Sequence, residues 1–108
     1  MRDVRADAIF FCGVDGDRLM LTRGKYSMYY RCPKYELKNR TGDETVCMNR
    51  LSLDEEELLY SELEELDDED NIKEGVSGKI RHLMYTIDEV NDVYIKVYVI
   101  NRNKVKLD

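Results

Sequence analysis

The chain contains three cysteines, all in its first half, and residues that favour turns adjoin them. Cys12 precedes Gly13, and Cys32 precedes Pro33. Cysteine sulfur is a preferred zinc ligand, and side chains that flank tight reversals of β-hairpins can reach one shared ion. The odd number of cysteines argues against a disulfide framework and favours reduced thiols, which bind metal or pack in the core.

The segment "CGVDG", residues 12–16, adds an oxygen ligand to these sulfurs. Asp15 stands three residues after Cys12, so both side chains lie on one turn, where glycines let backbone amides point at the ligand atoms. We predict one zinc site formed by Cys12, Asp15, Cys32 and Cys47. A carboxylate is a harder zinc ligand than a thiolate, so it weakens such a site.

Two alternatives to this zinc site remain open. The three thiols could be small buried core residues without a metal, since free cysteine is commonly buried, and Asp15 could be an ordinary turn residue. His82, the only histidine, is the other candidate for the fourth ligand. It lies far along the chain in a segment of strand-like composition.

The elements that would position these residues form three blocks. The chain has 108 residues, of which 43% are hydrophobic and 37% charged, so it forms one compact domain with a thin core. We predict a zinc-ribbon-like β subdomain over residues 1–50, with strands at 8–12, 18–22, 26–32 and 45–48. The polar segment 38–44 is predicted to be a loop.

The second block, residues 51–74, is predicted to be one acidic amphipathic helix. Ser52 precedes Glu55 by three residues, which is the spacing of a capping box at a helix start. Leu59, Leu63 and Leu66 recur at helical spacing, so their side chains should face a core.

The third block, residues 75–108, is predicted to be a β-hairpin packed against that helix. Its strands are 80–87 and 93–100, and they follow a flexible segment, "EGVSGK". In the second strand one face carries Val93, Ile95, Val97 and Val99. The fold class predicted from the three blocks is α+β.

Residues 8 to about 66 resemble the zinc β-ribbon of large serine recombinases. That module has a C-x-x-C-G turn, a strand containing Leu and Met, a basic hairpin, a "Y-x-C" segment and a last cysteine before a leucine-rich helix. Here Asp15 stands in place of the second cysteine, while Tyr30 and Cys32 match the second turn. The resemblance implies a zinc ribbon that touches DNA and an origin in a bacterial mobile genetic element. The chain departs from the family because it is too short for a catalytic domain and its helix is too short for a coiled-coil arm.

Basic residues are interspersed with tyrosines between residues 18 and 40. Bases that neutralise phosphates and rings that stack on nucleotides are typical of nucleic-acid surfaces. The candidate nucleic-acid contacts are Arg18, Arg23, Lys25, Arg31, Lys34, Lys38 and Arg40. The alternative is a solvated hairpin whose tyrosines pack between strands.

Residues 51–74 contain twelve acidic residues and one lysine. A helix this acidic could act as a DNA-mimic inhibitor or a protein-interaction element, because it would steer a basic partner. The candidate partner-binding residues are Glu62, Glu64, Glu65 and Asp67. Most such charge runs are solvated faces that aid solubility, so that alternative stays open.

No catalytic motif accompanies the cysteines. The sequence lacks H-E-x-x-H and H-x-E patterns and a glycine-rich phosphate loop. We therefore predict a non-enzymatic binding protein with zinc as a structural ion. No segment has the length of apolar sequence that a membrane helix needs, and the N-terminus lacks a signal-peptide layout, so we predict a cytoplasmic protein.

Overall fold

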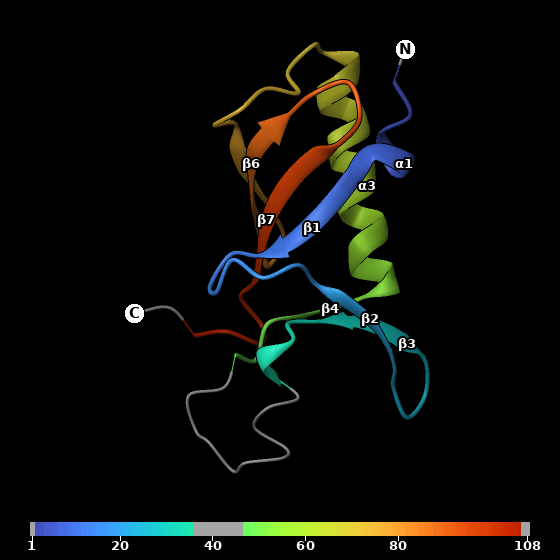
Figure 1. Cartoon of the computed structure of the whole chain (residues 1–108), viewed down its shortest axis with the longest axis vertical. Helices are drawn as coiled ribbons and strands as arrows, with labels where there is room; N and C mark the ends of the chain where they lie inside the picture. The colour runs from blue at the N-terminus through green and yellow to red at the C-terminus, as the bar shows by residue number, and fades with distance from the viewer. Residues whose placement is uncertain (1, 36–46, 107–108) are drawn as a thin grey trace.

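The computed structural model of the protein describes residues 2–35 and 47–106. It confirms the α+β class: two β-sheets accompany one main helix (Figure 1). The elements, in chain order, are α1 (Val4–Asp7), β1 (Ala8–Cys12), β2 (Met20–Arg23), β3 (Met28–Arg31), β4 (Arg50–Ser52), α3 (Leu53–Asp68), β5 (Ser77–Ile80), β6 (Leu83–Val90) and β7 (Ile95–Asn101).

The larger sheet has the strand order β1-β7-β6-β5, and the smaller one has the order β2-β3-β4. In the larger sheet β1 runs parallel to β7, while the other neighbouring strands are antiparallel. Helix α3 runs behind this sheet, and the smaller sheet lies below it in Figure 1. The core consists mainly of side chains between α3 and the larger sheet.

The strand predicted at 8–12 is present, but its partner is β7 and not the strand that follows it. Among residues 2–35 and 47–106, one isolated bridge, between Phe11 and Arg18, links β1 to the chain just before β2. Along β1, buried and half-buried residues alternate, while no residue of β2 is buried. Pairing with β7 places Phe10 beside Val97, which is fully buried, whereas every residue of β2 is exposed or half-buried.

Helix α3 begins where the sequence predicts. The Ser52 side chain accepts from the Glu55 backbone N–H, and the Glu55 side chain accepts from the Ser52 N–H, so the capping box is complete. Leu59 and Leu63 are each 1% exposed, and Leu66 packs against the core from a half-buried position. The predicted apolar stripe is therefore confirmed.

The C-terminal strands differ from the prediction at their ends. A turn at Arg81, whose φ is 54°, divides residues 80–87 into the end of β5 and the start of β6. The segment predicted to be flexible contributes strand β5. Val93 is 79% exposed because it lies in a turn, where its N–H and that of Tyr94 donate to the Asn91 side chain.

Two further predictions concern the chain around Cys47. The predicted strand 45–48 is wrong at Cys47 and Met48, which have no strand structure; the strand here is β4, beginning at Arg50. Residues 45 and 46, and the predicted loop 38–44, lie outside the described residues. Within the described ranges, no helix has the length and apolar character needed to cross a membrane.

Candidate metal centre

The first half of the candidate site is the turn that follows β1. The Cys12 N–H donates to the Asp17 carbonyl at 2.7 Å, and the Gly16 N–H donates to the Cys12 carbonyl at 2.8 Å. Gly16 has a φ of 81°, which favours glycine. The turn points the backbone N–H groups of Val14 and Asp15 at the Cys12 sulfur, each at 3.4 Å.

The second half of the site joins the ends of β3 and β4. Cys32 follows β3, and its N–H donates to the Asn49 carbonyl at 3.1 Å, so the segment around Cys47 lies beside it. The Tyr35 N–H donates back to the Cys32 carbonyl at 3.0 Å, which closes a turn after the cysteine. Cys12, Cys32 and Cys47 are all buried and free of disulfides.

The structure brings the four predicted ligands together. One ligand atom from each of Cys12, Asp15, Cys32 and Cys47 lies within 4.8 Å of all the others. The Cys12 and Cys47 sulfurs are 3.5 Å apart, and Asp15 Oδ2 is 3.4 Å from the Cys32 sulfur and 3.8 Å from the Cys12 sulfur. Tetrahedral zinc with ordinary Zn–S and Zn–O bonds would hold its ligands about 3.5–3.8 Å apart. The residues therefore fit a tetrahedral metal ion.

Burial and neighbouring charges set the protonation of the side chains in the cluster. Burial is the largest cause that raises the pKa of the Cys32 thiol, to about 12, and it also raises the pKa of Cys47. A bound divalent ion reverses this effect, because a coordinating thiol loses its proton. Burial alone would raise the pKa of Asp15, but hydrogen bonds from Cys47 and Cys32 and the nearby Lys34 amine together lower it.

Asn49 is a component of the site that the sequence analysis missed. It is 1% exposed, and its Nδ2 donates to the Cys12 sulfur at 3.3 Å and to the Val99 carbonyl at 2.8 Å. Its Oδ1 accepts from the Asn101 N–H at 2.9 Å. Asn49 thus links the cluster to the end of β7. Asparagine in the segment "CMNR" is typical of a turn, so nothing in the sequence indicated this role.

His82, the other candidate for the fourth ligand, lies elsewhere. Its Nε2 contacts the Glu55 carboxylate near the start of α3. The group of possible ligands contains Asp15 and not His82.

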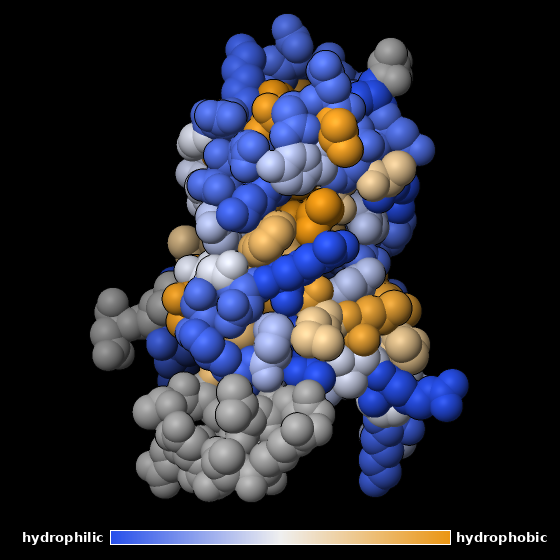
Figure 2. Space-filling model, in the orientation of Figure 1, coloured by the Kyte–Doolittle hydropathy of each residue, from blue (hydrophilic) through white to orange (hydrophobic). Residues whose placement is uncertain are grey.

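The predicted nucleic-acid contacts occupy different environments. Arg18, Arg23 and Lys25 are exposed. Arg31 is only 7% exposed, and Lys34 pairs with Asp15 at 3.4 Å. Lys38 and Arg40 lie outside the described residues. Figure 2 shows apolar side chains gathered over the region of β2 and β3 on an otherwise largely hydrophilic face, and two of the β2 residues, Met20 and Leu21, are 47% and 51% exposed.

The predicted partner-binding acids are partly engaged within the molecule. Glu62 accepts from the Tyr85 hydroxyl at 2.7 Å, and Glu64 pairs with Arg5 at 3.1 Å. Glu65 is exposed and Asp67 is half-buried. Two of the four carboxylates therefore already have a partner on another element.

Comparison of the chain with protein-family models, curated proteins and solved structures finds no match. The resemblance to recombinase zinc ribbons, the mobile-element origin and the cytoplasmic location therefore stay predictions from the sequence.

Proposed function

We propose that Cys12, Asp15, Cys32 and Cys47 bind one structural zinc ion and that the protein is a non-enzymatic binding module built around it. The observation that supports this is the short separation of the ligand atoms. The Cys12 and Cys47 sulfurs are 3.5 Å apart, and Asp15 Oδ2 is 3.4 Å from the Cys32 sulfur and 3.8 Å from the Cys12 sulfur. Thiolates select zinc over the hard cations, which prefer oxygen.

A structural role follows from the number and origin of the ligands. Four protein ligands complete a tetrahedron, whereas catalytic zinc keeps an open position for water. Cys12 ends a strand of the larger sheet, while Cys32 and Cys47 belong to the chain of the smaller sheet. Zinc bound here would tie the two sheets together.

Metal analysis of protein purified without added zinc tests this proposal. We expect one zinc per chain in the wild type and a marked loss in Cys32→Ser, because the hydroxyl replaces a thiolate ligand. Asp15→Asn should weaken binding, while Asp17→Asn, a matched change in the same turn, should retain the metal. Wild-type protein that takes up no zinc when it is supplied, or an Asp17→Asn variant that loses as much zinc as Asp15→Asn, would contradict the proposal.

For the binding role, we propose that the hairpin β2–β3 contacts nucleic acid. Tyr26 at its tip is 90% exposed, and the Lys25 amine lies 5.4 Å from the centre of its ring. Exposed Arg23 lies on the same hairpin. An exposed ring flanked by bases suits stacking on a nucleotide and contact with phosphates.

Titration of zinc-loaded protein with duplex and single-stranded DNA at two salt concentrations tests the binding role. We expect weak binding that falls steeply with salt and is reduced in the double variant Lys25→Ala with Tyr26→Ala. Lys73→Ala, an exposed lysine beyond α3, should bind as the wild type does. Absence of binding at low salt would remove this role and leave the zinc assignment intact.

The acidic-helix alternative has less support, because Glu62 and Glu64 have internal partners.

A further inference from the structure

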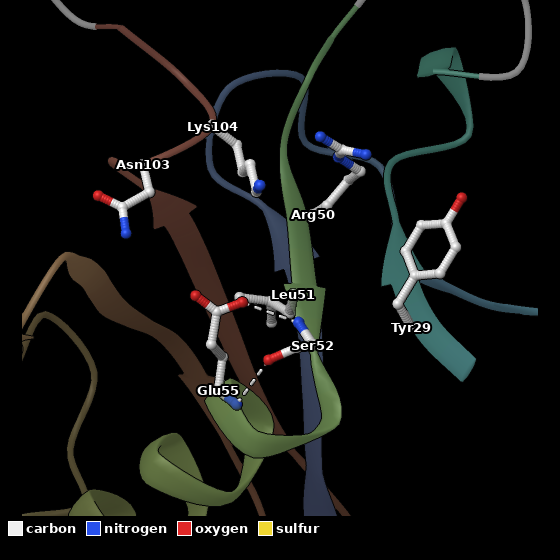
Figure 3. Close-up of a pocket in the computed structure, with 7 residues that line it drawn as sticks. All are labelled: Tyr29, Arg50, Leu51, Ser52, Glu55, Asn103 and Lys104. Atoms are coloured by element: carbon white, nitrogen blue, oxygen red, sulfur yellow. Dashed lines mark hydrogen bonds between the residues drawn. The ribbon is translucent and has the colours of Figure 1, made fainter. Parts of the chain in front are cut away.

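A pocket of about 310 Å³ lies where β4 meets the turn after β7 (Figure 3). The residues that matter for its chemistry are Tyr29, Arg50, Ser52, Glu55, Asn103 and Lys104. They come from β3, β4, the first turn of α3 and the chain after β7, so the pocket exists only in the folded protein.

Asn101 fixes the part of the pocket that follows β7. It is fully buried, and its side-chain oxygen accepts from the Asn103 N–H at 3.0 Å. Its carbonyl accepts from the Lys104 N–H, also at 3.0 Å. Its Nδ2 donates to the Arg50 carbonyl at 2.7 Å, which holds this turn against β4. The positions of Asn103, Lys104 and Arg50 are therefore coupled through one buried residue.

Two cations lining the pocket lack an acidic partner in the described part of the chain. Arg50 and Lys104 take part in none of the ion pairs found there. The Arg50 Nε is buried and has no hydrogen-bond partner, while its guanidinium lies 5.0 Å from the centre of the Tyr35 ring. A buried donor without an acceptor is costly and rare in folded proteins. The Nε itself is shielded from solvent, so an anion entering the pocket would bind the guanidinium at its terminal nitrogens.

The one carboxylate in the pocket is already engaged. Glu55 accepts from the Ser52 N–H at 2.8 Å and from Asn101 Nδ2 at 3.1 Å, and it contacts His82. In Figure 3 its carboxylate lies below the Lys104 amine, and no ion pair in the described part of the chain joins it to Lys104 or Arg50. The two cations are thus free of this acid and able to meet an incoming anion.

We propose that this pocket binds a phosphate group carried by a small molecule or by a nucleic-acid end. The planar guanidinium of Arg50 can donate two parallel hydrogen bonds to phosphate oxygens, and Lys104 adds a point charge. The side chains of Tyr29 and Asn103 add neutral donors. The volume is at the small end of ligand pockets, which suits a terminal phosphate with one attached group and not an internal stretch of polymer. The site is separate from the zinc cluster and from the tip of the β2–β3 hairpin.

Amide NMR titration of zinc-supplied protein with inorganic phosphate tests the proposal. We expect saturable shifts at the amides of Ser52, Asn103 and Lys104. Lys104→Ala should weaken binding about tenfold, the usual effect of losing one charge-assisted contact. Lys106→Ala is the matched control: it removes the same charge two residues away on the same exposed tail and should bind phosphate normally.

Two comparisons identify the source of the phosphate. Binding of adenosine monophosphate tests whether the site takes a free nucleotide. Binding of a short oligonucleotide with or without a 5′-phosphate tests whether it takes the end of a strand. A preference for either phosphorylated ligand over its unphosphorylated form supports the site. Equal losses in Lys104→Ala and Lys106→Ala, or the absence of saturable shifts at these amides, would overturn it. These outcomes do not decide whether the β2–β3 hairpin binds nucleic acid. That proposal is tested by the variants at Lys25 and Tyr26, which do not line this pocket.

Discussion

The two sheets of this protein bury apolar side chains to very different extents. The larger sheet and α3 enclose apolar side chains that are at most 1% exposed, namely Leu59, Leu63, Leu83, Ile87, Ile95, Val97 and Val99. In the smaller sheet β2 has no buried residue, and β3 and β4 have one each. The strands of the smaller sheet bury only Arg31 and Leu51, and the chain that adjoins them adds Cys32 and Cys47 of the cysteine cluster. Where a small chain runs short of apolar surface, a bound metal can supply the missing stability.

Removal of the proposed zinc ion should produce the largest difference between the two sheets. Structural zinc contributes on the order of 10 kcal/mol to small zinc-dependent folds, so its loss should open the smaller sheet. We expect a strong chelator to abolish amide exchange protection in β2, β3 and β4 while β6 and β7 keep much of theirs. Hydrogen exchange followed by NMR gives this measurement. Equal loss in both sheets would show that the molecule unfolds as one unit, and no loss would show that the cluster is not needed.

The opposite perturbation is Leu63→Ala, which acts on the apolar core. Leu63 is 1% exposed, and truncation of a buried leucine costs about 2–5 kcal/mol because it removes contacts and leaves a cavity. We expect lower stability in urea unfolding while the zinc content of the folded protein is unchanged. Leu53→Ala is the control, since Leu53 lies on the same helix but is 43% exposed. Loss of zinc from folded Leu63→Ala would contradict this expectation, because it would show that metal binding depends on the packing of the apolar core.

Asn49 connects the two regions, so its truncation should affect the metal more than the core. Loss of a hydrogen bond to a metal ligand typically lowers metal affinity about 10–100-fold. We expect a decrease of this size for Asn49→Ala, measured by competition with a zinc chelator of known affinity. Asn71→Ala, at an exposed position after α3, should bind zinc as the wild type does. Unchanged affinity in Asn49→Ala would mean that the contact with the Cys12 sulfur has no role in binding.

The smallest expected effect concerns Glu55 and pH. Burial would raise the pKa of Glu55, but hydrogen bonds from Ser52 and the neighbouring His82 outweigh it and lower the pKa. A group with a lowered pKa in the folded state contributes stability above its unfolded pKa and loses it as the pH falls through the folded value. We expect Glu55→Gln to be less stable than the wild type by about 1 kcal/mol near neutral pH. This difference should begin to shrink as the pH falls below about 4, the range of an ordinary glutamate, and should close once the pH is below the lowered pKa of the folded state. Urea unfolding over a pH series measures it, and a constant difference would contradict it.

Local patterns predicted the elements well, whereas pairing between distant strands lay beyond them. The capping box at Ser52 and the spacing of Leu59 and Leu63 depend on neighbours within two turns, and both are confirmed. The parallel pairing of β1 with β7 joins segments more than eighty residues apart, and no period in the sequence encodes such a choice. The exposure of Val93 was missed for a simpler reason: alternation continued through a turn that Asn91 closes.

The sequence by itself determined the type of the main helix, the α+β class and the four candidate ligands, because these depend on residue chemistry and short spacing. Tertiary structure alone decided that those ligands converge, that Asp15 and not His82 joins the sulfurs, and that Arg50 and Lys104 line one pocket. Convergence requires segments far apart in the chain to meet, as Arg50 and Lys104, 54 residues apart, do at this pocket. The burial of apolar side chains between α3 and the larger sheet is what brings such distant segments together.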